Sequence, residues 1–310
     1  MARFGWRKHP QPAGEPDPVF SYFSTDQAAR LRSLVREAFA ERGIEVTLQP
    51  DRVEATGGAQ YGLTNVAAAC RTAPAKNWPD IVTWHVDRVL RALDAPTVAD
   101  LDDETVLSRV FVRLMGTSMV PDLSWYGYRR ELGGDLIEVL ALDSEDSVTL
   151  LSDHDVARFG VQSLRESGLV NLLAEPFGEW ERIEVAPGAA FGLLVGESVF
   201  TASRLLTLND VLRRTLGEIS TPDGVLVCVP TRHQLAVHVL ADETVMPVLP
   251  AMARLALTGY DDGVGPVSPH LFWYRSGQLQ PLSRLDEDGA LHIEVDGRFA
   301  EVLSRLTGTD

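Results

Sequence analysis

Apolar and polar positions follow clear periodicities in the second half of the chain, where they predict a β-hairpin between two helices. Two runs rich in β-branched and apolar residues, 225–229 and 235–240, flank the polar turn 230–234. Before and after the hairpin, apolar residues recur at a spacing of three or four, which predicts amphipathic helices over 205–219 and 245–257. This helix, hairpin and helix form the expected core of the protein.

The same periodicities predict an α+β fold with mostly antiparallel sheets and packed amphipathic helices, because hairpins and helices are mixed along the chain. They divide it into two domains, a small one over 21–96 and a larger one over 105–310. The acidic stretch 97–104 predicts a linker between them, and the proline-rich stretch 1–20 predicts a flexible tail. Further helices are expected over 24–43, 61–71, 77–93, 152–160, 161–173 and 299–306, and further strands over 45–49, 52–55, 106–115, 136–142, 147–151, 180–185, 190–195, 270–275, 278–282 and 290–295.

The charge of the chain narrows the classes of partner. Of its 310 residues, 44 are acidic and 28 are Lys or Arg, which gives a formal net charge of −16. Nucleic acids and anionic membranes bind concentrations of Lys and Arg, so we expect neither as a partner. A negative surface attracts a basic protein, although it also serves solubility alone. No stretch approaches the ~20 apolar residues of a membrane span, and the N-terminus lacks the apolar run of a signal peptide, so a cytoplasmic protein is expected.

The sequence contains none of the common catalytic or cofactor motifs. A phosphate-binding loop, a dinucleotide-binding glycine motif and the zinc-protease helix motif are all absent, and Ser198 lacks the second glycine of a nucleophile elbow. Cys70 and Cys228 are too far apart for the usual zinc spacing, and both have the surroundings of small buried hydrophobes. We therefore expect no metal and no cofactor.

A glycine-led run at 196–206, with the sequence GESVFTASRLL, precedes the central helix and hairpin. Before it, the segment from residue 146 contains a strand, a polar cap at 152–155, a helix and a strand pair. Over 146–240 this order resembles a bacterial family catalogued as domain of unknown function 1444, in which a similar run precedes a strand ending in Val-Pro. The resemblance covers about a third of the chain. It implies a cytoplasmic bacterial α+β protein, and it implies no activity, cofactor or site residues.

One polar loop has the composition of an interaction site. Trp125, Tyr126 and Tyr128 are followed directly by Arg129 and Arg130. Aromatic side chains beside arginines are typical of the residues that dominate protein interfaces. The alternative is that the rings pack beneath the loop as a small satellite core.

A second group of residues could support catalysis. Asp153, His154 and Asp155 place two carboxylates beside an imidazole, which could bind a metal or orient a base. Consecutive helical residues point in different directions, however, which favours the alternative that Ser152 or Asp153 is the N-cap of a helix whose dipole favours Asp155. His238 alternates with valines along its strand, where it is either a general base or a half-buried strand histidine.

Two functional hypotheses from different classes follow. The missing catalytic motifs and the negative charge favour a non-enzymatic binding protein, such as an adaptor, an inhibitor or an immunity-like protein, that binds a protein partner. The alternative is a metal-dependent or His/Asp-based hydrolase that uses Asp153, His154, Asp155 or His238. A homo-oligomer that pairs through exposed strand edges is a third hypothesis.

Overall fold

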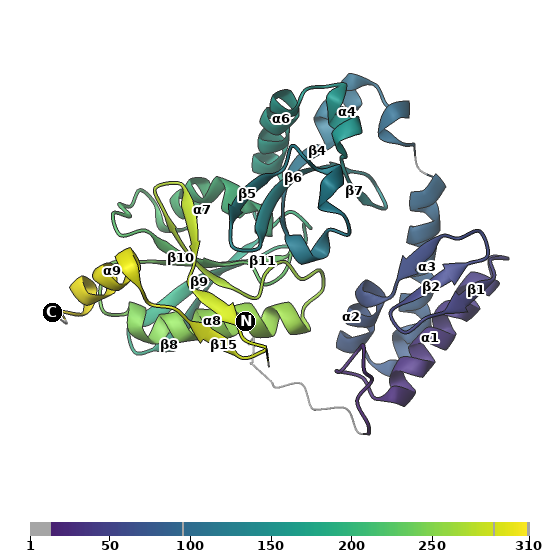
Figure 1. Ribbon diagram of the computed structural model, residues 1–310, viewed down its shortest axis with the longest axis horizontal. Coiled ribbons are helices and arrows are strands. Elements are labelled where there is room, and N and C mark those ends of the chain that lie inside the picture. Colours follow the sequence, from purple (N-terminus) through teal and green to yellow (C-terminus); the bar gives the residue numbers. More distant parts are fainter. Residues whose placement is uncertain (1–13, 95, 288, 309–310) are drawn as a thin grey trace. The chain divides into compact units, whose positions relative to one another are not determined.

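The computed structural model describes residues 14–94, 96–287 and 289–308, and it divides the chain into two compact units, Met1–Ala95 and Pro96–Asp310 (Figure 1). The prediction of an α+β fold is confirmed, because helices accompany sheets whose strand pairs are antiparallel wherever the structure describes them. Within those residues, no helix is both long enough and apolar enough to span a bilayer.

The smaller unit packs helices against a short sheet. Its N-terminal helix begins at a capping box, in which Ser24 Oγ accepts from Gln27 N at 3.2 Å and the Gln27 side chain accepts from Ser24 N at 2.9 Å. The expected helix over 61–71 is wrong at its start, because Tyr61 lies in a third strand. The elements are α1 (Thr25–Ala40), β1 (Val46–Leu48), β2 (Arg52–Ala55), β3 (Gln60–Gly62), α2 (Thr64–Thr72) and α3 (Trp78–Asp94), with the strands in the order β1-β2-β3.

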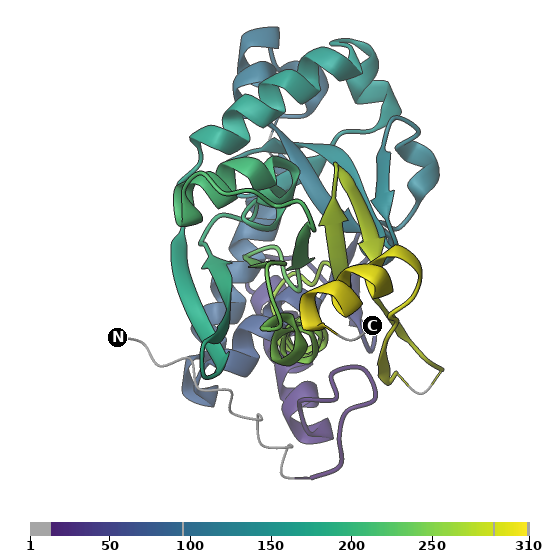
Figure 2. The ribbon, with the colours of Figure 1, turned by 90° about the vertical axis from the view of Figure 1, so that its left-hand side faces the viewer.

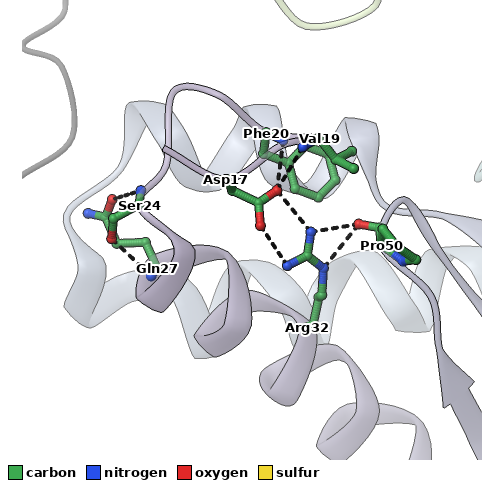
Figure 3. A network of polar contacts seen from close by, with 7 residues as sticks. All are labelled: Asp17, Val19, Phe20, Ser24, Gln27, Arg32 and Pro50. Atoms are coloured by element: carbon green, nitrogen blue, oxygen red, sulfur yellow. Dashed lines mark hydrogen bonds and ion pairs between the residues drawn. The ribbon is translucent and has the colours of Figure 1, made fainter. Parts of the chain in front are cut away.

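The predicted flexible tail, 1–20, is wrong for its last residues, and its first thirteen lie outside the described part of the chain. Asp17 is only 4% exposed and Phe20 only 3%. The Asp17 carboxylate accepts two hydrogen bonds from the guanidinium of Arg32 on α1, at 2.9 and 3.0 Å (Figure 3). The segment before α1 is therefore part of the core of this unit.

The predicted linker, 97–104, is also wrong, because this stretch folds onto the larger unit. Val98, in a short helical turn η2 (Val98–Asp100), is buried in the same hydrophobic cluster as Val106. Asp102 is an N-cap that accepts from Thr105 N at 2.7 Å, and it starts α4 (Asp103–Arg109). The acidic residues thus start a helix, which also replaces the first part of the strand expected over 106–115.

A six-stranded antiparallel sheet forms the centre of the larger unit. The hairpin predicted from the periodicity lies in its middle, with Leu226 opposite His238. Alternate residues of the strands point to two hydrophobic clusters, one with α8 and α9 and the other with α7 and the turn before it. Helix α9, yellow in Figures 1 and 2, places Phe299 5.3 Å from the Trp273 ring. The strands are β8 (Glu179–Ala186), β9 (Ala189–Val195), β10 (Val225–Cys228), β11 (Gln234–Val239), β12 (Leu271–Arg275) and β13 (Gln278–Pro281), in the order β13-β12-β10-β11-β9-β8, and the helices are η5 (Ala202–Thr207), α7 (Leu208–Leu216), α8 (Val245–Asp262) and α9 (Gly297–Thr307).

A second, four-stranded sheet in the same unit supports the aromatic loop. Its order is β4-β6-β5, and β7 pairs with β6 as well. Helix α6 packs so closely on β4 that a Cβ at Gly168 would lie 2.7 Å from Val112 N, which accounts for a glycine inside that helix. The elements are β4 (Val110–Gly116), β5 (Arg130–Gly133), β6 (Leu136–Asp143), β7 (Val148–Leu150), α5 (Asp153–Ala157) and α6 (Val161–Ala174), and the unit also contains the strand pair β14 (Ser283–Leu285) and β15 (Leu291–Ile293).

Candidate functional site

The aromatic loop connects β4 to β5, which are both labelled in Figure 1. It contains the short turns η3 (Thr117–Met119) and η4 (Leu123–Trp125). Asp122 starts η4 by accepting a hydrogen bond from Ser124 N at 2.9 Å. The three rings differ in their exposure to solvent. Trp125 is 63% exposed, Tyr126 is 9% exposed and Tyr128 is half-buried. The two tyrosines pack beneath the loop, and only Trp125 extends into solvent.

Tyr128 anchors the loop to the sheet below. Its hydroxyl donates to Leu151 O at 2.6 Å and accepts from Leu140 N at 3.0 Å. It therefore bridges β6 and the residue that follows β7. Burial raises the pKa of Tyr128 well above its ordinary value, so the hydroxyl keeps the proton that it donates.

Carboxylates hold the loop from two sides. Asp153 accepts from Gly127 N at 2.9 Å and from Tyr128 N at 3.2 Å. On β6, Glu138 is 3% exposed and accepts from Arg165 Nε at 2.8 Å, while the same guanidinium donates to Tyr128 O at 2.7 Å. Sequence reasoning missed Glu138 and Arg165. The available signal was a single carboxylate inside the apolar run 136–142, because a buried charge needs a partner.

The two predicted arginines are engaged within the protein. Arg129 donates to Tyr126 O at 3.4 Å and forms an ion pair with Glu131 at 3.2 Å. Arg130 forms an ion pair with the buried Glu138 at 3.5 Å. The surface around Trp125 is therefore less basic than the composition of the loop indicates, and the exposed residues Asp122 and Asp153 lie in the loop and against it.

The residues of the hydrolase hypothesis do not form one site. Asp155 belongs to a capping box with Ser152, whose backbone N–H and hydroxyl it binds at 2.8 and 2.7 Å. Asp153 holds the aromatic loop, and His154 is exposed on α5. In the described residues, no group of three or more His, Cys, Asp or Glu side chains is arranged to hold a metal ion.

His238 lies in the other sheet, on β11. Its Nδ1 is 2.9 Å from Ala190 O, and because a carbonyl oxygen only accepts, Nδ1 carries the proton. Its Nε2 is buried with no hydrogen-bond partner in the part of the chain described here. Burial is the main cause that lowers the pKa of His238, so this imidazole is neutral near pH 7.

Replacing Asp153 by alanine is expected to loosen the aromatic loop. The backbone N–H groups of Gly127 and Tyr128 lose their acceptor, so their hydrogen exchange should accelerate by about tenfold or more. Hydrogen-exchange mass spectrometry of peptides over 123–131 measures this change. His154→Ala is the matched control, since it alters an exposed side chain next to Asp153 on α5. Equal exchange in both variants would contradict the anchoring role of Asp153.

Comparison with known proteins found no relative of the chain. No family model matches the chain, and no curated protein or solved structure matches it either. The resemblance of 146–240 to the family of unknown function therefore remains an expectation from the sequence.

Proposed function

We propose that the protein is a non-enzymatic binding protein, of the adaptor, inhibitor or immunity type, whose Trp125 contacts a protein partner. The observation that supports this most is a 63% exposed indole on a loop held by Tyr128, Asp153 and Arg165. A large ring on a backbone that is already held loses less conformational freedom on binding than a ring on a mobile loop. Trp125 has the properties of an interface anchor.

The charge of the chain and of the loop favours a basic partner. The formal net charge is −16, and the exposed residues Asp122 and Asp153 lie in the Trp125 loop and against it. A Lys or Arg of the partner would meet both a carboxylate and the face of the indole. The same charge argues against nucleic acid and anionic membrane as partners. Two free, buried cysteines, Cys70 and Cys228, suit the cytoplasmic location that we infer.

Trp125→Ala is expected to weaken capture of the partner by about tenfold or more, the effect of losing one hot-spot side chain. Tagged full-length protein is used at low and high salt, captured proteins are identified by mass spectrometry, and the purified partner is then titrated. Trp84→Ala is the matched control, because Trp84 is also exposed, at 57%, but lies on α3 with the Arg88 guanidinium 4.7 Å from its ring centroid. Binding should also weaken as salt rises.

Three outcomes would count against the proposal. Equal affinity of the Trp125→Ala and Trp84→Ala variants would exclude the loop as the interface. Capture of no partner, together with hydrolytic activity lost in His154→Ala or His238→Ala, would favour the hydrolase. Elution of the purified protein at twice its mass of 34.0 kDa, abolished by Trp125→Ala, would contradict a basic partner, because the partner would be a second copy of this acidic chain.

A further inference from the structure

A pocket of about 410 Å³ lies at one end of the six-stranded sheet, away from the Trp125 loop. It forms where β9 and β11 stop pairing. Their last paired residues are Gly192 and Val237, and beyond them the His238 side chain, instead of a backbone group, binds Ala190 O. The last turn of α7 contributes Leu216 to the wall. The opening of the strand ladder thus leaves a space beside the ends of β9 and β11.

The lining of the pocket combines polar and apolar side chains, and the Trp180 ring forms part of it. A Cβ at Gly192 would lie 1.9 Å from the Trp180 ring, so the ring lies directly against the glycine backbone, which no other residue would allow. Leu216 is 45% exposed at the end of α7, and Val237 and Val239 extend the apolar surface along β11. This surface suits a flat or branched apolar group.

Two opposite charges lie in the same lining. Arg182 is exposed on β8, two residues from Trp180 and on the same face of the strand, and it makes no ion pair with any residue that the structure describes. Asp242 is held in place by Thr244, whose backbone N and Oγ1 lie 2.9 and 2.5 Å from Asp242 Oδ1. These hydrogen bonds lower the pKa of Asp242, so its carboxylate is charged. The charge of Asp242 raises the pKa of His238 and that of Arg182 lowers it, so both charges are close enough to His238 to interact with it.

We propose that this pocket binds a small zwitterion of amino-acid size, with its carboxylate at Arg182, its ammonium at Asp242 and its apolar side chain against Trp180. A volume of about 410 Å³ is near the lower end of the range for small-molecule sites. One cation and one anion in a lining that also holds apolar side chains complement a ligand with both charges. In a smaller pocket of about 270 Å³, by contrast, Asp210 and Arg213 pair with each other at 2.6 Å and their charges are already satisfied. This inference is independent of the function proposed for Trp125.

Saturation-transfer NMR on the full-length protein tests the ligand class with three probes. L-Phenylalanine carries both charges, 3-phenylpropanoate only the carboxylate, and phenethylamine only the ammonium. L-Phenylalanine should bind at least about tenfold more tightly than either of the others, because each loses one ion pair. Arg182→Gln should reduce the affinity for L-phenylalanine and 3-phenylpropanoate and leave that for phenethylamine unchanged. Asp242→Asn should reduce the affinity for phenethylamine and leave that for 3-phenylpropanoate unchanged.

Arg254→Gln is the matched control, since it removes the same charge from an exposed position on α8 outside the pocket. Both tested side chains are exposed, so the variants should fold. Saturation transfer from none of the probes would overturn the proposal. So would an equal loss in Arg254→Gln, or tight binding of a singly charged probe that matches L-phenylalanine.

Discussion

Arg204→Ala is expected to destabilise the larger unit by about 4 kcal/mol. Arg204 is only 1% exposed and is the largest of the fully buried side chains among the residues that the structure describes. Its guanidinium donates to Glu175 O at 2.8 Å and to Pro176 O at 3.2 Å. Removal takes the donor from both carbonyl groups and leaves a cavity where the long aliphatic stem packs, and truncation of a long buried side chain costs about 2–5 kcal/mol.

The surroundings of Arg204 show why the position is sensitive. The guanidinium lies 5.1 Å from the ring centroid of Phe177, in the connection between α6 and β8. Burial is the main cause that lowers the pKa of Arg204, and the nearby Arg214 adds to it. The buried charge is therefore costly in itself. Arg204→Met, which keeps most of the stem and removes the charge, should lose only about half as much stability as Arg204→Ala.

Urea unfolding of the full-length protein measures the effect, read from the amide NMR signals of β10 and β11 so that the two units are followed separately. The midpoint should fall at an unchanged slope. Arg254→Ala, at an exposed position on α8, is the control and should change the free energy of unfolding by less than about 0.5 kcal/mol. A similarly small change in Arg204→Ala would show that the carbonyl groups find other partners.

The periodicity of apolar residues predicted the helices and strands that bury a regular face of their own. The hairpin of β10 and β11 was correct because alternating residues face two hydrophobic clusters. The helix expected over 205–219 ends earlier, at Leu216, because Gly217 adopts a φ of +77°, and Ile219 is left 39% exposed. In the linker, charge density concealed a helix start, since an N-cap and a solvated acidic stretch have the same composition.

The candidate site was predictable in composition but not in arrangement. The loop was identified from its rings and arginines, yet nothing in the sequence shows that Asp153 binds the backbone of Tyr128, 25 residues earlier. The pairing of Glu138 with Arg165 spans 27 residues and depends on how α6 packs on the sheet. Trp180 and Arg182 lie in an ordinary alternating strand, and only the opening between β9 and β11 makes them part of a pocket.

Acid is expected to destabilise the smaller unit through Asp17. The hydrogen bond from Arg32 is the main cause that lowers the pKa of Asp17 from 3.8 to about 2. A carboxyl with a lower pKa in the folded state stabilises it above the unfolded pKa, and this contribution disappears as the pH falls from about 5 to about 2. The difference corresponds to about 2 kcal/mol, which is large for a unit of this size. Urea unfolding at several pH values, read from the NMR signals of α1, follows this loss.

Asp17→Asn should remove a similar free energy at neutral pH and flatten the acid dependence, because the neutral amide has no charge for Arg32 to pair with. Asp26→Asn, an exposed position in the first turn of α1, is the control and should leave both the stability and its acid dependence almost unchanged.

Arg32 also donates to Pro50 O at 3.0 and 2.7 Å, so it joins the segment before α1 to the turn before β2 (Figure 3). Lysine cannot make both contacts from one planar group, so Arg32→Lys should destabilise the unit although it keeps the charge. Full stability of Arg32→Lys would show that charge alone holds this segment. An unchanged acid dependence in Asp17→Asn would show that the Asp17–Arg32 ion pair is not the cause of the loss of stability in acid.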